Sequence, residues 1–84
     1  MVARRVIVRP SARKHGIDDA DIVVVALSPL ASGPLDEEVP QRQLRIGFDT
    51  RARLLEIVVL VWDDGTEEAI HAMKCRPMYL HLLD

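Results

Sequence analysis

The stretch Gln43–Lys74, QLRIGFDTRARLLEIVVLVWDDGTEEAIHAMK, decides the fold that we expect for this chain. Its aliphatic and β-branched runs are separated by short polar segments, a pattern that predicts strands at Gln43–Phe48, Leu54–Trp62 and Thr66–Lys74. Asp64-Gly65 favours a two-residue hairpin turn, because both residues tolerate a positive φ. The stretch therefore predicts a three-stranded antiparallel sheet.

The lengths of the two expected turns set the register of this sheet. A two-residue turn places Val58 opposite His71, and a four-residue loop at Asp49–Ala52 places Arg45 opposite Glu56. Both hairpins then agree on a single buried face. Its expected members are Leu44, Ile46, Leu55, Ile57, Val59, Ile70 and Ala72.

The N-terminal half predicts shorter elements. Arg4–Arg9 is typical of a short strand or extended arm, and Ser11–His15 of a helical turn that ends at a glycine. Asp18 begins a second helix, in which the apolar run Ile22–Leu27 is expected to be buried nearly all round. Ala31–Pro40 is expected to be a loop, because it contains a glycine and two prolines.

A short helix from about Pro77 to Leu83 is expected to close the domain by packing Met78, Leu82 and Tyr79 on the sheet. A chain of 84 residues, 49% of them hydrophobic, has enough apolar surface for one core. The predicted fold class is thus α+β, in a single domain over residues 1–84. It comprises a short N-terminal strand or arm, two helices, a three-stranded antiparallel sheet and a short C-terminal helix.

The chain has the composition of a cytoplasmic protein. Cys75 is the only cysteine, so no intrachain disulfide can form, which fits a reducing compartment. No apolar run is long enough to span a membrane, and no apolar segment follows Arg4 and Arg5 as it would in a secretory signal. We therefore expect neither a membrane span nor secretion.

Positive charge is concentrated in two segments, although the net charge is −2. Residues 1–16 carry five basic side chains and no acidic one, and residues 42–53 carry four against Asp49 alone. A polyanion could bind to these segments. The alternative is that they are ordinary solvated faces.

The predicted uncovered face of the sheet carries a catalytic set: Glu56, His71 and Arg45. A carboxylate can take the proton of a ribose 2′-hydroxyl, an imidazolium can protonate the leaving 5′-oxygen, and a guanidinium can hold the phosphate. These residue types therefore suffice for RNA cleavage without a metal. The alternative is a cross-strand Arg45–Glu56 ion pair with a half-exposed histidine nearby.

Other cations could contact an RNA backbone. Lys14 and His15 could supply a phosphate contact or an acid, although both also suit a helix C-terminus. Lys74 and Arg76 could bind an anion at the start of the last helix, or could be solvated. The three histidines lack a metal-ligand spacing, so neither a metal nor an organic cofactor is expected.

Two segments resemble the BrnT-like toxins. Arg13–Ile17, RKHGI, followed by an acidic helix start, is similar to the KHG segment of that family, and Leu44–Arg76 is similar to its strand pattern. The likeness spans about residues 11–80. The chain departs from the family in the more apolar helix at Ile22–Leu27 and in the RRVIVRP segment. It also has His71-Ala72-Met73 in place of a usual Ser-Ala-Arg.

The resemblance implies the toxin of a type II toxin–antitoxin system, with a RelE-like or microbial-ribonuclease-like fold, that cleaves RNA. It implies a cognate antitoxin with a DNA-binding part, in a hetero-oligomer with the toxin; a homo-oligomer is the other assembly considered. The RNA-binding residues expected from motif position and charge are Lys14, His15, Arg53, Lys74 and Arg76.

The leading hypothesis is therefore a ribosome-independent endoribonuclease toxin, with Glu56 as base, His71 as acid and Arg45 on the phosphate. A second hypothesis is a non-catalytic module that binds a partner protein through an open sheet edge and the apolar helix. A third is a toxin of related fold with another target, such as a gyrase.

Overall fold

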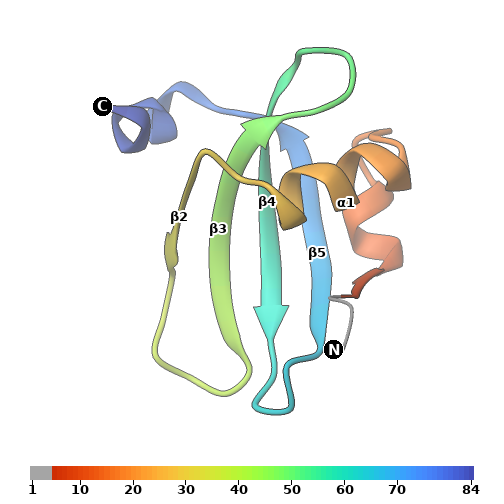
Figure 1. The fold of residues 1–84 in the computed structure, drawn as a ribbon, viewed down its shortest axis with the longest axis vertical. Helices are drawn as coiled ribbons and strands as arrows, with labels where there is room; N and C mark the ends of the chain where they lie inside the picture. The colour runs from red at the N-terminus through yellow and green to blue at the C-terminus, as the bar shows by residue number, and fades with distance from the viewer. Residues whose placement is uncertain (1–4) are drawn as a thin grey trace.

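A mixed sheet with strand order β1-β5-β4-β3-β2 runs through the molecule (Figure 1). The computed structural model describes residues 5–84, so Arg4 lies outside the described residues. β1 is parallel to β5, whereas the other neighbouring pairs are antiparallel. The strands are β1 (Val6–Val8), β2 (Ala31–Pro34), β3 (Gln41–Phe48), β4 (Leu54–Val61) and β5 (Glu67–Lys74).

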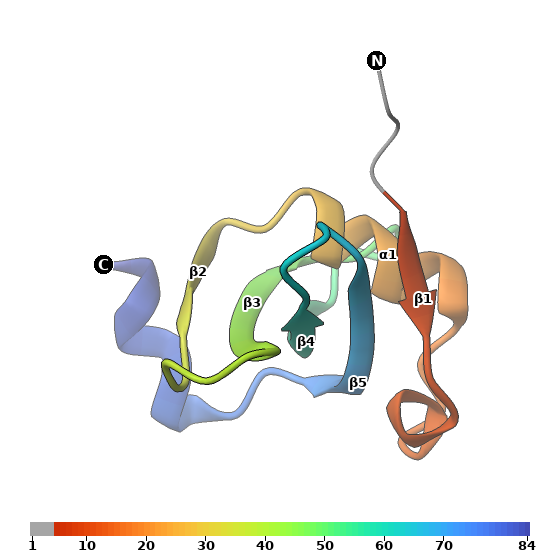
Figure 2. The ribbon, with the colours of Figure 1, turned by 90° about the horizontal axis from the view of Figure 1, so that it is seen from below.

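The expectation of a three-stranded antiparallel sheet is wrong, because the sheet has five strands and one parallel pair. The additional strands are the two edges, which Figure 2 shows on opposite sides of the molecule. β2 lies inside the segment Ala31–Pro40, which was expected to be a loop. An edge strand tolerates glycine and proline, since a proline there can turn its missing N–H away from the neighbouring strand.

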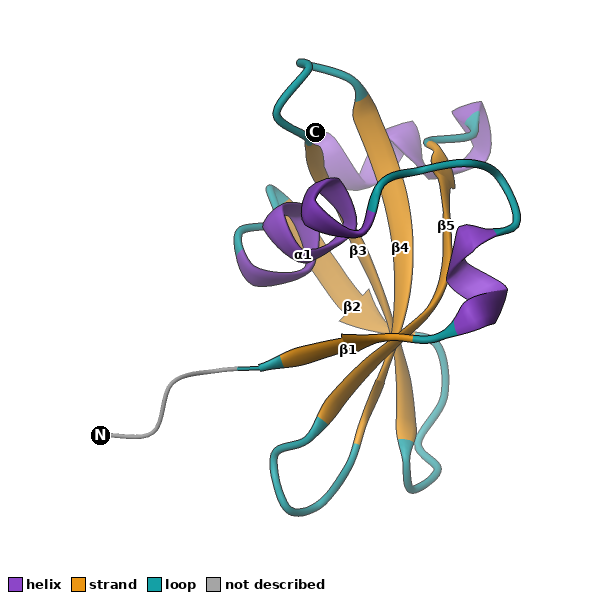
Figure 3. Ribbon diagram, turned by 90° about the vertical axis from the view of Figure 1, so that its right-hand side faces the viewer, coloured by secondary structure: helices purple, strands orange, loops and turns teal. Residues whose placement is uncertain are grey.

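One α-helix and two 3₁₀ helices occur in residues 5–84: η1 (Pro10–Arg13), α1 (Asp19–Leu27) and η2 (Pro77–Leu83). α1 packs across one face of the twisted sheet (Figure 3). The core between them consists of Ala12, Ile17, Ile22, Val25, Ala26, Leu55, Ile57, Val59, Ala69 and Ala72. None of the helices in the described part of the chain is long and apolar enough to cross a membrane.

The expectation that the apolar helix is buried nearly all round is wrong. Val24 is 38% exposed on the outer side of α1, because a single helix layer covers the sheet and no element within residues 5–84 covers that side of the helix. Asp18 precedes α1 without capping it through its side chain, which instead accepts a hydrogen bond from Arg51 at 3.0 Å.

The hairpin between β4 and β5 has one residue more than expected. Trp62 pairs with Thr66 around a three-residue loop, and Gly65 adopts a φ of +89°, as in a type I turn followed by a bulge. A β-bulge at Ile70 then absorbs the shift, so that Val58 faces His71 as expected. The Ser11 hydroxyl donates to the carbonyl of Ile70 at 2.7 Å.

The loop between β3 and β4 is also one residue longer than expected. Phe48 pairs with Leu54, which places Glu56 opposite Ile46 and Arg45 opposite Ile57. The predicted register of this hairpin is therefore wrong, and Arg45 and Glu56 lie on opposite faces of the sheet.

The expected single buried face consequently divides in two. Leu44 and Ile46 share the face that carries Glu56, whereas Leu55, Ile57 and Val59 face α1. Both faces are well covered at the sheet centre, because Leu44 and Ile46 are also buried.

Candidate functional site

Arg45 does not belong to the candidate site. Its side chain is only 6% exposed beneath α1, where it donates hydrogen bonds to the carbonyl of Ala26 at 2.9 Å and to Gln43 at 3.0 Å. It also forms a bidentate ion pair with Glu67, with both N···O distances at 2.9 Å. A guanidinium held in this way is a structural group that no substrate can reach.

Glu56 lies on the other face of the sheet and is fully buried, at 0% exposed. Its Oε1 accepts hydrogen bonds from the backbone N–H and the Nε of Arg76, both at 2.9 Å. Its Oε2 accepts from the Arg76 guanidinium at 2.7 Å and lies 3.0 Å from Nε2 of His71. Burial raises the pKa of Glu56, but the hydrogen bonds from Arg76 and His71 outweigh it, so the pKa lies below its ordinary value.

Glu56 was expected to act as the general base. Its geometry instead suits it to hold Arg76 and His71 in place through hydrogen bonds. An ionised carboxylate can only accept hydrogen bonds, so Nε2 of His71 must carry the proton that points at Glu56. The other ring nitrogen, Nδ1, is then the one that can take or give a proton. The Glu56–His71 pair is therefore a carboxylate–imidazole arrangement with a defined tautomer.

A second imidazole lies beside the first. The ring of His15 meets the ring of His71 edge to face, with 5.8 Å between the centroids. The N-terminal segment is anchored to β5 by Ser11 and by the N–H of Arg9, which donates to the carbonyl of Ala69 at 2.9 Å. Gly16 follows His15 with a φ of +75° and turns the chain toward α1. These contacts bring His15 next to His71 from fifty-six positions away in the chain.

Arg76 connects the imidazoles to an aromatic side chain. Its guanidinium lies 5.4 Å from the centroid of the Tyr79 ring, while its side chain remains 45% exposed. Tyr79 was expected only to pack on the sheet. The sequence did contain a signal for this contact. Arg76 and Tyr79 are three positions apart at the start of a helical turn, a spacing that puts both side chains on the same side of the helix. We call His15, Glu56, His71, Arg76 and Tyr79 the catalytic cluster, after the role that is proposed for them below.

The remaining predicted RNA-binding residues have different surroundings. Lys14 is exposed and adjacent to His15 in the chain. Arg53 binds Asp49 at 2.6 Å and Asp21 at 3.4 Å, so it holds the β3–β4 loop to α1. Lys74 is exposed at the end of β5 and, by alternation, points to the face opposite Met73. Only Lys14 of these three is placed to contact a ligand of the catalytic cluster.

The catalytic cluster carries the groups needed for acid–base chemistry on a phosphodiester. Two imidazoles lie side by side, one with a buried carboxylate behind it, and a guanidinium borders them. Among residues 5–84, no group of three or more His, Cys, Asp or Glu side chains is arranged to hold a metal ion.

The chain was compared with models of protein families, with curated proteins and with solved structures, and none of them matches it. The resemblance to the BrnT-like toxins therefore stays a prediction from the sequence motifs.

Proposed function

We propose that this protein is the toxin of a toxin–antitoxin pair and that it acts as a metal-independent endoribonuclease. The observation that carries the proposal is the adjacency of His15 and His71, with Glu56 and Arg76 behind and beside them. The two segments that resemble BrnT-like toxins contain all four residues: RKHGI contains His15, and Leu44–Arg76 contains Glu56, His71 and Arg76. His71 itself is a departure from that family, which usually has a serine there.

The roles follow from exposure and hydrogen bonding. His71, with Glu56 fixing its tautomer, is the general base, and Nδ1 takes the proton from the ribose 2′-hydroxyl. The 2′-oxygen then attacks phosphorus and the bond to the 5′-oxygen breaks, which leaves a 2′,3′-cyclic phosphate. His15, which is exposed, donates the proton to the leaving 5′-oxygen. Arg76 and Lys14 neutralise the phosphate as its negative charge grows.

The test is cleavage of single-stranded RNA by the purified protein in EDTA. We expect products with 2′,3′-cyclic phosphate ends, because the 2′-oxygen attacks the phosphorus as the 5′-oxygen leaves. His71→Ala should abolish cleavage, and imidazole added to the buffer should restore part of it. Cleavage by His71→Ala at the wild-type rate would exclude the assigned base.

A matched pair of cation variants separates local from general charge effects. Lys14→Ala should lower the cleavage rate about ten-fold, in the range of a charge-assisted phosphate contact. Arg51→Ala removes the same charge from an exposed ion pair with Asp18 and should leave the rate unchanged. Equal losses in both variants would mean that the positive charge acts only at long range.

The antitoxin is part of the same proposal. Several apolar side chains of η2 are exposed, Met78 at 60% and Leu80 at 45%, and a partner that covers them would bury surface that a monomer leaves in water. Growth arrest on induction, relieved by co-expression of the adjacent gene, tests this part. Partner binding without arrest and without RNA cleavage would instead favour the non-catalytic interaction module.

A further inference from the structure

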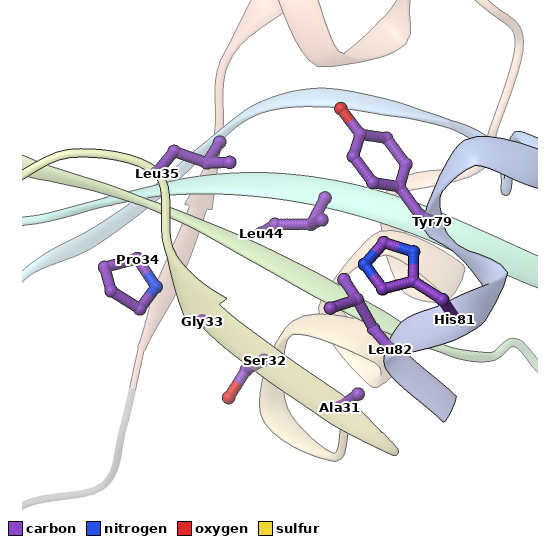
Figure 4. Close-up of a pocket in the computed structure, with 9 residues that line it drawn as sticks. All are labelled: Ala31, Ser32, Gly33, Pro34, Leu35, Leu44, Tyr79, His81 and Leu82. Carbon is purple, nitrogen blue, oxygen red and sulfur yellow. The ribbon is translucent and has the colours of Figure 1, made fainter. Parts of the chain in front are cut away.

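A pocket of about 280 Å³ lies between the edge strand β2 and the C-terminal helix η2 (Figure 4). Tyr79, His81 and Leu82 approach it from η2, the backbone of β2 forms the opposite wall, and Leu44 lies between them. The lining is mainly apolar and includes one flat aromatic ring. Its volume is below the usual range for drug-sized ligands, so it suits one ring system better than an extended chain.

The pocket is continuous with the catalytic cluster in two ways. Tyr79 belongs to both, since it lines the pocket and lies against the guanidinium of Arg76. In addition, one cross-strand row joins Gly33, Leu44, Val58 and His71 in register. Leu44 is therefore two strand spacings, about 10 Å, from His71 on the same face of the sheet.

We infer that this pocket binds a single nucleobase of the RNA, next to the phosphate that is cleaved. The inference deepens the proposed function and depends on it for the identity of the ligand. With the phosphate at Arg76, the neighbouring base lies within reach of Tyr79, which offers a ring for stacking. His81 and the backbone of the edge strand β2 provide the polar groups that can distinguish one base from another.

Gly33 allows the pocket to be filled without disturbing the fold. A Cβ built at Gly33 has no neighbouring atom within 4 Å, and the backbone there does not need a positive φ. Gly33 is the cross-strand partner of Leu44, so a side chain at this position points into the same space. Gly33→Val therefore occupies the pocket without replacing any residue of the catalytic cluster, and of that cluster it faces only Tyr79. Ala20→Val adds a side chain at an exposed position of α1 and serves as the matched control.

The first experiment is an NMR titration of the labelled protein with AMP, GMP, CMP and UMP separately, and with ribose 5-phosphate. We expect one nucleotide to shift the signals of Gly33, Leu44 and Tyr79, and ribose 5-phosphate to shift only Arg76 and its neighbours. Gly33→Val should lower the affinity for that nucleotide about ten-fold or more and leave the affinity for ribose 5-phosphate unchanged. Ala20→Val should match the wild type in both titrations.

The second experiment sequences the ends of RNA fragments cut by the wild type and by Gly33→Val. If Gly33→Val loses the base preference of the wild type, the result supports the proposed base pocket. If the preference is unchanged, the base pocket is excluded, whereas the proposed ribonuclease activity is not. If the wild type cuts no RNA, the proposed function fails, and the titration alone decides: no shifts at Gly33 and Leu44 overturn the base pocket as well. Shifts caused only by a partner protein and by no nucleotide would also overturn it.

Discussion

The Nε2 atom of His71 lies 3.0 Å from Oε2 of Glu56, across neighbouring strands and in a diagonal relation, because Glu56 pairs with Met73 and Val58 pairs with His71. The diagonal position of His71 was expected from the sequence and is confirmed. The complete burial of Glu56 beneath Arg76 was not expected. This contact makes Glu56 a positioning residue and leaves the proton chemistry to the imidazoles.

Glu56→Gln should lower the free energy of unfolding by about 2–3 kcal/mol, because the amide replaces a carboxylate that accepts charge-assisted hydrogen bonds from Arg76. It should also lower kcat more than KM, since His71 loses its fixed tautomer. Urea denaturation and steady-state kinetics measure the two effects. Glu68→Gln near the start of β5 should cost about 1 kcal/mol or less, because its partner Arg9 is half exposed. Equal effects of the two substitutions would contradict the special role of Glu56.

Arg45→Met should destabilise the fold by about 3–5 kcal/mol, because Glu67 is left as a buried charge without its bidentate partner. Arg45→Met combined with Glu67→Leu should recover most of this loss, since a buried ion pair can often be replaced by apolar side chains. Both stabilities are read from denaturant midpoints. The folded fraction of Arg45→Met should cleave RNA with an unchanged KM. A strongly raised KM would instead mean that Arg45 contacts the substrate.

Ala52→Gly should raise the free energy of unfolding by about 0.5–1 kcal/mol. Ala52 has a φ of +59° in the β3–β4 loop, where glycine carries no steric cost from a Cβ atom. Thermal unfolding of the two proteins measures the difference. Ala20→Gly at an exposed position of α1 should shift the midpoint in the opposite direction, because glycine disfavours a helix.

Stability should fall below about pH 4. The Thr50 hydroxyl and N–H lower the pKa of Asp21, and the Glu56 pKa is lowered as described above. Burial raises the pKa of Asp49, but hydrogen bonds from the N–H and the side chain of Arg53 outweigh this effect, so the pKa of Asp49 is lowered overall. These carboxyls bind protons more weakly when folded, so their contribution is present above their unfolded pKa values and is lost as the pH falls through the folded ones. Asp21→Asn should make the fall between pH 4 and pH 3 shallower in thermal melts, and an unchanged slope would contradict this assignment.

Local sequence signals were sufficient for the three central strands, the acidic start of α1 and its end before Pro29. Each depends on the chemistry of adjacent residues: β-branched runs, polar turns, and a proline that cannot continue a helix. Glu56 and His71 share one face as expected, but only because the β-bulge at Ile70 compensates for the longer β4–β5 loop. The short strand expected within Arg4–Arg9 is confirmed as β1, but its parallel pairing with β5 was not expected. The edge strand β2 was missed, because four residues of edge pairing leave almost no pattern in a sequence.

The face of the sheet on which Arg45 lies was decided by tertiary structure. The β3–β4 loop has five residues because Asp49 accepts the N–H groups of Arg51 and Arg53, and Asp21 of α1 accepts that of Thr50. Asp21 is twenty-nine positions away from Thr50, so no local pattern contains this contact. One additional loop residue moves every side chain of β3 to the other face relative to β4. The amino-acid sequence by itself determined which residues could do chemistry, and long-range packing decided which of them meet.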